Sequence, residues 1–312
     1  MIGSEIGGAP GPLRIAREVL SLSVGRPIRI IARFSRRKPL GAVGGAIVLV
    51  LILMAIFAPF IAPYGDRELI PLETGRDVVY LPPSFEFPMG TDHIGRDIRS
   101  RILYGARISL YVGLGSVLIG ITASFILGVA FTYIGGKIDL AFQRLVDALM
   151  ALPGLIIALA IMAVLGASLN NVIIAIIIGL LAPVIRTVRA QVLALKEMEY
   201  ITAARAVGCT PPRIIFWHII PNCFAIYLVL ATFYLGAAII IEASLSFLGV
   251  GSPPDVPSWG GMLTIAAKEH VKTAPWAAIF PGMAIFVVVL GFNLMGDALR
   301  DILDPRLRGT GR

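Results

Sequence analysis

Five long runs without a charged side chain decide what this chain can fold into. They cover residues 39–65, 108–136, 148–185, 214–241 and 273–296. Each run is longer than the roughly 20 residues with which an α-helix crosses a bilayer. Only 15% of the 312 residues are charged, whereas soluble domains carry about 25%. The sequence therefore predicts an all-α membrane protein.

The run 148–185 is too long for a single span. Its 38 residues would form a helix of about 57 Å, whereas the hydrocarbon core of a bilayer is about 30 Å thick. The only polar break near its middle is Gly166–Asn171, so we expect the chain to fold back there. This gives six transmembrane helices, and we expect Pro153 and Pro183 to kink the third and fourth.

Six spans would place both termini on one side of the membrane, and the basic residues indicate which side. Segments on the side of the N-terminus hold 19 Arg and Lys residues, and those on the other side hold 8. Because cytoplasmic segments carry the excess, we predict that the basic segment 1–38, the polar segment 186–218 and the C-terminus are cytoplasmic. The net charge of +8 is then a topology signal and does not indicate nucleic-acid binding. The six-helix domain is expected to occupy residues 39–312.

The first outer loop is predicted to cover residues 66–107. Four arginines crowd its end: Arg96, Arg99, Arg101 and Arg107. Asp92 and Asp97 are close enough in sequence to neutralise some of them, and Asp97 and Arg101 have the i,i+4 spacing of a helical ion pair. We therefore expect an interfacial helix at the end of this loop.

Small residues recur at helical spacing in the polar segment 186–218. Ala203, Ala204 and Gly208 would let another surface approach the backbone, and Gly208 can adopt the left-handed conformation that ends a helix. Thr210 and Pro211 then have the pattern of an N-cap followed by proline at the first helical position. We expect two short helices at an angle, which together form a docking element on the membrane face.

Motifs for catalysis or ATP binding are absent from the sequence. Gly135-Gly136-Lys137 is followed by Ile138, where a phosphate-binding loop has Ser or Thr. The three histidines fall in separate segments and the two cysteines are isolated, so neither residue type has the spacing of a metal site. We expect no enzyme activity and no cofactor in this chain.

The middles of the spans contain no Asp, Glu, Lys or Arg, where carriers driven by protons or sodium commonly place them. Only Glu242, near the outer end of the fifth span, comes close; it could anchor the segment that follows or lie beside a substrate path. An ion-coupled secondary carrier therefore lacks its charges, and a purely structural scaffold leaves the polar segment without a role. The pattern favours energy delivered from outside the membrane.

The polar segment resembles the loop that membrane subunits of ATP-binding-cassette (ABC) importers insert into their ATPases. The matching residues, which would form the ATPase-coupling site, are Tyr200, Ala203, Ala204, Arg205, Gly208 and Pro221. Thr202, His218 and Ile220 stand where the generic motif has Glu, Ile and Leu. These departures resemble the variant found in the peptide and nickel branch.

Further motifs follow in the order seen in the second permease of dipeptide and oligopeptide importers. Their outer-loop residues are Gly90, Thr91, Asp92, Gly95, Arg96, Asp97, Glu242 and Trp259. The resemblance covers nearly the whole chain from about residue 36, and it implies the type I ABC importer permease fold.

The resemblance also implies partners and a cargo. The partners would be a homologous permease, two cytoplasmic subunits that bind ATP and Mg²⁺, and an extracytoplasmic binding protein, all at the cytoplasmic membrane of a prokaryote. The cargo would be di- and oligopeptides, with nickel chelates, glutathione and short oligosaccharides as alternatives. The few polar groups of the spans, which could line a pathway, include Thr122, Ser124, Asn170 and Asn171. They suit a neutral zwitterion better than a bare cation, which requires carboxylate, imidazole or thiolate ligands.

Overall fold

The computed structural model describes residues 35–36, 38–69, 78–269 and 272–303. Most of the basic segment 1–38 and the C-terminal residues 304–312 therefore lie outside the described residues. Five helices are long and apolar enough to cross a membrane: α2 (Pro39–Ile61), α3 (Ile98–Ile134), α6 (Leu169–Lys196), α9 (Ile220–Phe247) and α11 (Trp276–Leu303). Within the described ranges there is no β-strand, which confirms the all-α prediction.

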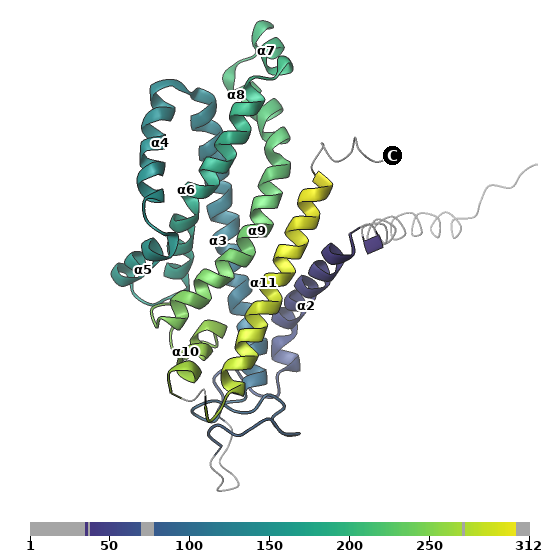
Figure 1. Ribbon diagram of the computed structural model, residues 1–312, viewed down its shortest axis with the longest axis vertical. Coiled ribbons are helices and arrows are strands. Elements are labelled where there is room, and N and C mark those ends of the chain that lie inside the picture. The colour runs from purple at the N-terminus through teal and green to yellow at the C-terminus, as the bar shows by residue number, and fades with distance from the viewer. Residues whose placement is uncertain (1–34, 37, 70–77, 270–271, 304–312) are drawn as a thin grey trace, which may run out of the picture.

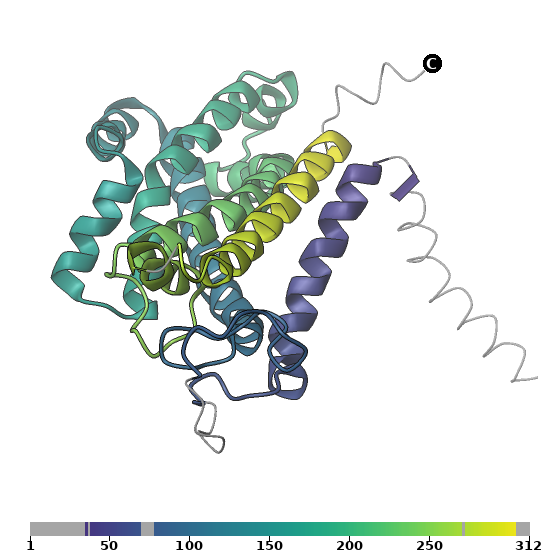
Figure 2. The same cartoon turned by 60° about the horizontal axis from the view of Figure 1, so that its bottom comes forward.

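Helix α3 lies in the middle of the bundle and packs against α2, α6 and α9. Helix α2 lies beside α11 on one side of the molecule. Helices α4 (Gly136–Met150) and α5 (Gly154–Leu165) lie on the opposite side (Figures 1 and 2). The close packing of α2 on α11 depends on glycine: a Cβ atom on Gly44 would lie 2.6 Å from the carbonyl oxygen of Gly291.

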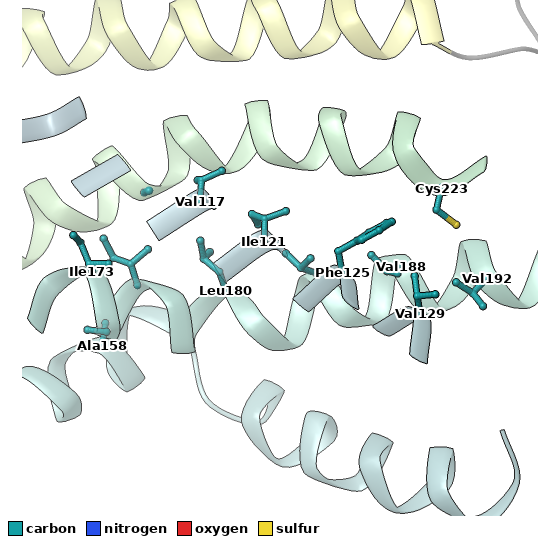
Figure 3. Packing of buried hydrophobic residues seen from close by; sticks show 14 of the residues in the cluster. Val117, Ile121, Phe125, Val129, Ala158, Ile173, Leu180, Val188, Val192 and Cys223 are labelled. Carbon is teal, nitrogen blue, oxygen red and sulfur yellow. The ribbon is translucent and has the colours of Figure 1, made fainter. Parts of the chain in front are cut away.

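The largest buried apolar cluster joins α3, α6 and α9. Figure 3 shows Val117, Ile121 and Phe125 of α3 facing Leu180 and Val188 of α6. The same cluster continues beyond the spans to Ile201, Ala204 and Ile214. The core of the membrane bundle therefore extends without a gap into the polar segment that follows α6.

The predicted fold-back within 148–185 is confirmed. Gly166 ends α5 with a φ of 81°, and the Ser168 hydroxyl accepts a hydrogen bond from the Asn171 backbone N–H at 3.4 Å, which caps α6. Pro183 lies inside α6, and the helix continues through it.

The kink expected at Pro153 is present, as a break between two helices. Helix α5 has only 12 residues, which is about 18 Å, and α4 meets it at an angle of 84°. Pro153 lies at the break, where its missing N–H and its restriction of the preceding residue stop α4 from continuing. By length and composition, the bent pair α4 and α5 is a candidate for the sixth span, in addition to the five long helices.

The helix expected at the end of the first outer loop is present, but it is not a separate element. Residues 98–107 are the first turns of α3, whose 37 residues form one continuous helix, and there is no separate interfacial helix at this point of the described chain. The expected Asp97–Arg101 pair does not form. Asp97 instead caps α3, because its carboxylate accepts hydrogen bonds from the Ser100 N–H at 2.8 Å and the Ser100 hydroxyl at 2.7 Å.

The two ends of the bundle differ in what they carry. The short helices α7 (Glu199–Ala206) and α8 (Pro211–Ile214) and the C-terminal end of α11 lie at one end, and α10 (Trp259–Glu269) and the loop before α3 lie at the other (Figure 1). The described ends of the chain meet, since Lys38 forms an ion pair with Asp301 at 2.5 Å. Which end faces the cytoplasm stays a prediction.

Candidate functional site

The segment between α6 and α9, residues 197–219, is called the coupling loop from here on. Helix α7 ends in the hydrogen-bond pattern of a Schellman motif: the Cys209 N–H donates to the Ala204 carbonyl and the Gly208 N–H to that of Arg205, both at 3.0 Å. Gly208 has a φ of 83°, as its sequence position predicted. Thr210 then precedes α8, with Pro211 at its start, but its hydroxyl makes no capping hydrogen bond.

A π-helical turn, η1 (Ile215–Ile219), joins α8 to α9. It is marked by a hydrogen bond from the Ile220 N–H to the carbonyl of Ile215, five residues back. Pro221 follows directly, and proline lacks an N–H and clashes with the carbonyl four residues earlier. The π-helical turn is wider than an α-helical turn and relieves that clash. Pro221, one of the residues that match the family motif, thus favours the π-helical turn through which the coupling loop enters α9.

The coupling loop has an inner and an outer face. Ile201, Ala204 and Ile214 are 0%, 8% and 1% exposed and belong to the main apolar cluster. Ala203 and Arg205 are exposed, and the side chain of Val207 is 79% exposed. Ala204 therefore packs inward, and Ala203 is the alanine that faces out; contact of either residue with a second protein stays a prediction.

Lys196, the last residue of α6, holds the start of the coupling loop against the end of α3. Its Nζ donates hydrogen bonds to the carbonyl oxygens of Thr132 and Tyr133 at 3.1 and 3.2 Å, which are carbonyls of the last helical turn and lack helical partners. Lys196 and Arg205 both lie 5.7 Å from the Tyr133 ring. These contacts connect the start of the coupling loop to the C-terminal end of α3.

Tyr200 lies at the junction of the coupling loop and α9. Its ring centroid is 6.4 Å from that of His218, and burial raises the pKa of its phenol above the ordinary value. The side chain is still 41% exposed. Tyr200 is thus placed to contact both the base of the loop and a surface outside the chain.

At the opposite end, the motif residues 90–97 fold into a compact turn. The Asp92 carboxylate accepts hydrogen bonds from the backbone N–H groups of Ile94 and Arg96 at 3.0 and 2.9 Å and from Arg96 Nε at 2.7 Å. The Thr91 hydroxyl donates to the carbonyl of Val78 and accepts from the Leu81 N–H. These contacts hold residues 78–96 of the loop together.

Two glycines of this turn are required by space and backbone conformation. Gly90 and Gly95 have φ values of 74° and 79°. A Cβ atom on Gly90 would lie 2.5 Å from the carbonyl oxygen of Leu81, and one on Gly95 would lie 2.6 Å from Val78. The role of both in this structure is to fold the loop.

Glu242 and Trp259 fix the second outer segment to the bundle. Trp259 is buried, and its indole Nε1 donates to the carbonyl of Ile102 in α3 at 3.1 Å. Glu242 is also buried and accepts a hydrogen bond from the Ser246 hydroxyl at 2.8 Å. Ser246 belongs to the same helix, and its hydroxyl also accepts a hydrogen bond from the Ser252 N–H at 3.1 Å, so Glu242 is linked to the segment that follows α9 through Ser246.

The candidate pathway residues do not come together in one site. Thr122 shares a hydrogen bond of 3.0 Å with Tyr227, and Asn170 accepts one of 2.8 Å from Tyr111. Asn171 donates to the carbonyls of Leu165 and Gly166 and so completes the turn before α6. Ser124 is fully buried and donates to Gly120, so its hydroxyl does not reach cargo in this conformation.

The sequence patterns did not predict a groove that lies between α4 and α6. It has a volume of about 620 Å³ and is lined by residues that include Asp139, Gln143, Asp147, Arg186 and Arg189. Arg189 Nη2 lies 2.8 Å from the Asp139 carboxylate, and Arg186 pairs with Asp147. The i,i+4 spacing of Asp139, Gln143 and Asp147 was the available signal, since it places the three side chains on one face of a helix.

Comparisons with known proteins agree with these features. A family model described as "Binding-protein-dependent transport system inner membrane component" matches residues 117–309, and one described as "N-terminal TM domain of oligopeptide transport permease C" matches residues 27–83. A di/tripeptide transport system permease protein DppC of Pseudomonas aeruginosa is 41% identical over 277 residues, which cover 86% of this chain and 89% of that protein.

Two further relatives are similar over most of their length. A dipeptide transport system permease protein DppC of Alkalihalophilus pseudofirmus is 43% identical over 277 residues, 88% of each chain. A glutathione transport system permease protein GsiD of Pectobacterium atrosepticum is 40% identical over 286 residues, which cover 92% of this chain and 93% of that protein.

Proposed function

Because the chain belongs to the family of binding-protein-dependent transport system inner membrane components, we propose that it translocates short peptides as one permease subunit of an ATP-driven importer. Members of this family are integral inner-membrane transport subunits and are not themselves enzymes. The observation that carries the proposal is the coupling loop, whose inner face is part of the bundle core and whose outer face is open.

In the proposed mechanism, cytoplasmic ATPase subunits hold the ATP and Mg²⁺ and bind the outer face of the coupling loop. Ala203, Arg205 and Val207 would contact them. A nucleotide shifts a conformational equilibrium only by its differential affinity for two states. The ATPases must therefore bind this face differently before and after they close, and the Lys196 contacts to α3 would pass the difference to the spans.

The proposal requires the coupling-loop end of the bundle to be cytoplasmic and the other end extracytoplasmic. The excess of basic residues supports this orientation. The folded outer loop and the segment with Trp259 would then face an extracytoplasmic binding protein, and a homologous permease would complete the pathway.

Di- and tripeptides are the cargo that the names of the relatives support best. Glutathione is the second candidate, because permeases named for glutathione transport are similarly close in identity and coverage. Both are short peptides with a free amino group and a free carboxylate, and glutathione carries one further carboxylate.

The test is an ATPase assay on the transporter that co-purifies with this chain, reconstituted in vesicles with its binding protein. We expect di- and tripeptides to stimulate ATP hydrolysis. We also expect them to accumulate inside those vesicles whose transporters have the ATPase side facing the lumen. Stimulation by glutathione alone would select the second candidate. Stimulation by a nickel chelate or an oligosaccharide, without any response to peptides, would refute the peptide assignment and leave the importer assignment intact.

A further inference from the structure

A polar groove and an apolar pocket lie next to each other along α4 and α6. The groove has a volume of about 620 Å³, and its lining includes Asp147 of α4 and Arg186 of α6. The pocket has a volume of about 160 Å³ and lies at the bend between α4 and α5, where its apolar lining includes Leu149, Ile178 and Pro183. Leu149 follows Asp147 by two positions and Pro183 precedes Arg186 by three. The same two helices can therefore hold a molecule that has a polar part and an apolar part.

The groove lies at the depth where a bilayer changes from hydrocarbon to headgroups. Helix α6 begins with polar residues, since Ser168 caps it and Asn170 and Asn171 lie in its first turn. Polar groups are costly in hydrocarbon, so α6 begins at one boundary of the hydrocarbon core. Arg186 lies about 26 Å and Arg189 about 30 Å further along the helix, and the core is about 30 Å thick. The charged groove is therefore at the opposite boundary, and the apolar pocket is on its hydrocarbon side.

The lining of the groove is electrically balanced. It carries two carboxylates and two guanidinium groups, those of Asp139, Asp147, Arg186 and Arg189. Arg189 donates to the Asp139 carboxylate from Nε and Nη2, at 3.4 and 2.8 Å. Lys196 also acts electrostatically on Asp139, but its Nζ binds carbonyl oxygens at the end of α3. A balanced lining favours a ligand with both signs of charge over a simple anion or cation.

Arg186 and Asp147 keep hydrogen-bonding groups free for such a ligand. Among the described residues, Arg186 donates only from Nη2, to Asp147 Oδ1, so its Nε and Nη1 are available. Asp147 Oδ2 lies 3.9 Å from Arg144 Nη1, which is too far for a hydrogen bond. The side chains of Arg186 and Asp147 are 52% and 43% exposed. A guanidinium group binds phosphate well, and a carboxylate accepts hydrogen bonds from an ammonium group.

From this arrangement we propose that α4 and α6 bind one phospholipid whose headgroup carries a primary ammonium group, the chemistry of phosphatidylethanolamine. The lipid phosphate accepts hydrogen bonds from Arg186, and the ammonium group donates to Asp147. One acyl chain occupies the apolar pocket at the bend. Phosphatidylcholine has no N–H with which to bind the carboxylate, and phosphatidylglycerol has no ammonium group. The site therefore selects a lipid by its headgroup.

The first experiment measures this selection. The transporter is purified through this chain, exchanged into an equimolar mixture of phosphatidylethanolamine, phosphatidylcholine and phosphatidylglycerol with identical acyl chains, and analysed by native mass spectrometry. We expect phosphatidylethanolamine to bind about tenfold more tightly than either of the others. Asp147→Asn and Arg186→Gln should each remove the preference. Arg107→Gln, at an exposed arginine near the other end of the bundle, should retain it.

Three outcomes would overturn the proposal. Equal binding of the three lipids by the wild-type transporter would show that the groove does not select a headgroup. An unchanged preference in Asp147→Asn and Arg186→Gln would place the lipid elsewhere in the transporter. A preference for phosphatidylglycerol would show that the groove binds phosphate alone, without a contact from Asp147 to an ammonium group.

The second experiment tests the apolar pocket separately. Ile178→Phe adds volume to the lining of the pocket, whereas Ile174→Phe makes the same change at an exposed isoleucine of α6 outside it. We expect Ile178→Phe to lower the affinity for phosphatidylethanolamine about tenfold and Ile174→Phe to leave it unchanged. Thermal unfolding of both variants checks that the bundle is intact. Wild-type lipid affinity in Ile178→Phe would refute the acyl-chain assignment.

Discussion

The Trp259 side chain lies directly against Gly105 of α3: a Cβ atom added to Gly105 would sit 2.5 Å from the indole Nε1. That nitrogen donates to the carbonyl oxygen of Ile102 at 3.1 Å. The indole thus fills the space left by a missing side chain and closes the segment after α9 onto α3. This contact gives a direct test of the outer end of the fold.

We expect Gly105→Ala to lower the free energy of unfolding by about 1–3 kcal/mol, because the added methyl group overpacks a filled site. Gly45→Ala is the matched control, since a Cβ atom there has nothing within 4 Å. Thermal unfolding of the two purified variants measures the difference. Equal midpoints would mean that the Trp259 contact is not tight in solution.

Ala203→Asp and Ala204→Asp should both reduce transport, for different reasons. Ala203 is exposed, so its variant should reach the membrane at normal levels and co-purify less ATPase. Ala204 is 8% exposed in the main cluster, so its variant buries an unpaired carboxylate and should accumulate poorly. Expression level and ATPase recovery, measured together, separate the two. An Ala203→Asp chain with full ATPase recovery would remove the outer face of α7 from the docking surface.

Gly208 should be replaceable by asparagine and not by valine. Its φ of 83° is strained for a residue with a side chain, but a Cβ atom there meets nothing within 4 Å. The cost is therefore conformational, about 1–2 kcal/mol for an ordinary residue and less for asparagine. We expect Gly208→Val to lose transport and Gly208→Asn to keep most of it. Transport by the valine variant at the wild-type rate would contradict a helix stop at this position.

Lys196→Met should weaken the link between ATP hydrolysis and transport. The change removes both hydrogen bonds to the end of α3 while keeping a side chain of similar length. We expect fewer peptides imported per ATP hydrolysed, with ATPase binding retained. Lys137→Met, at an exposed lysine, is the control. An unchanged ratio of transport to hydrolysis would mean that α3 is driven through other contacts.

The orientation predicts which single cysteines react with a membrane-impermeant thiol reagent. In a chain with Cys209 and Cys223 replaced, Asp255→Cys should be labelled in intact cells and Glu197→Cys should be labelled only after lysis. Both positions are exposed, so access to the reagent depends only on the side of the membrane. Labelling of Glu197→Cys in intact cells would reverse the topology and remove the coupling proposal.

Features that depend on neighbouring residues were predictable from the sequence. The stop at Gly208 and the turn at Gly166 follow from local backbone preferences, and length alone divided the run 148–185. The kink at Pro153 was predicted, but the helix α4 (Gly136–Met150) before it was not, because its charged residues pair with partners far along the chain. Asp147 and Asp139 of α4 pair with Arg186 and Arg189, which lie 39 and 50 positions further along the chain.

At the candidate site too, contacts between distant residues could not be predicted from the sequence, as the two faces of α7 show. Ala203 and Ala204 are equivalent in composition and adjacent in sequence, and only tertiary packing decides which one is buried. Likewise, the i,i+4 rule paired Arg101 with Asp97, whereas capping of α3 by Asp97 competed successfully for that carboxylate. Sequence patterns identified the right segments, and three-dimensional contacts assigned the individual roles.

Helix α3 runs unbroken for 37 residues, a rod of about 55 Å with Arg101 and Trp259 at its first turns and the carbonyls that bind Lys196 at its last. If α3 tilts as one rod, binding at its first turns and binding at its last turn are thermodynamically linked. Whatever docks at the outer loop and prefers one tilt of α3 must change affinity at the coupling loop, and the same factor applies in the reverse direction. Nucleotide bound by the ATPases at the coupling loop would then be measurable as a change in the affinity of the binding protein for the opposite end of α3. This change would not require cargo to cross the membrane.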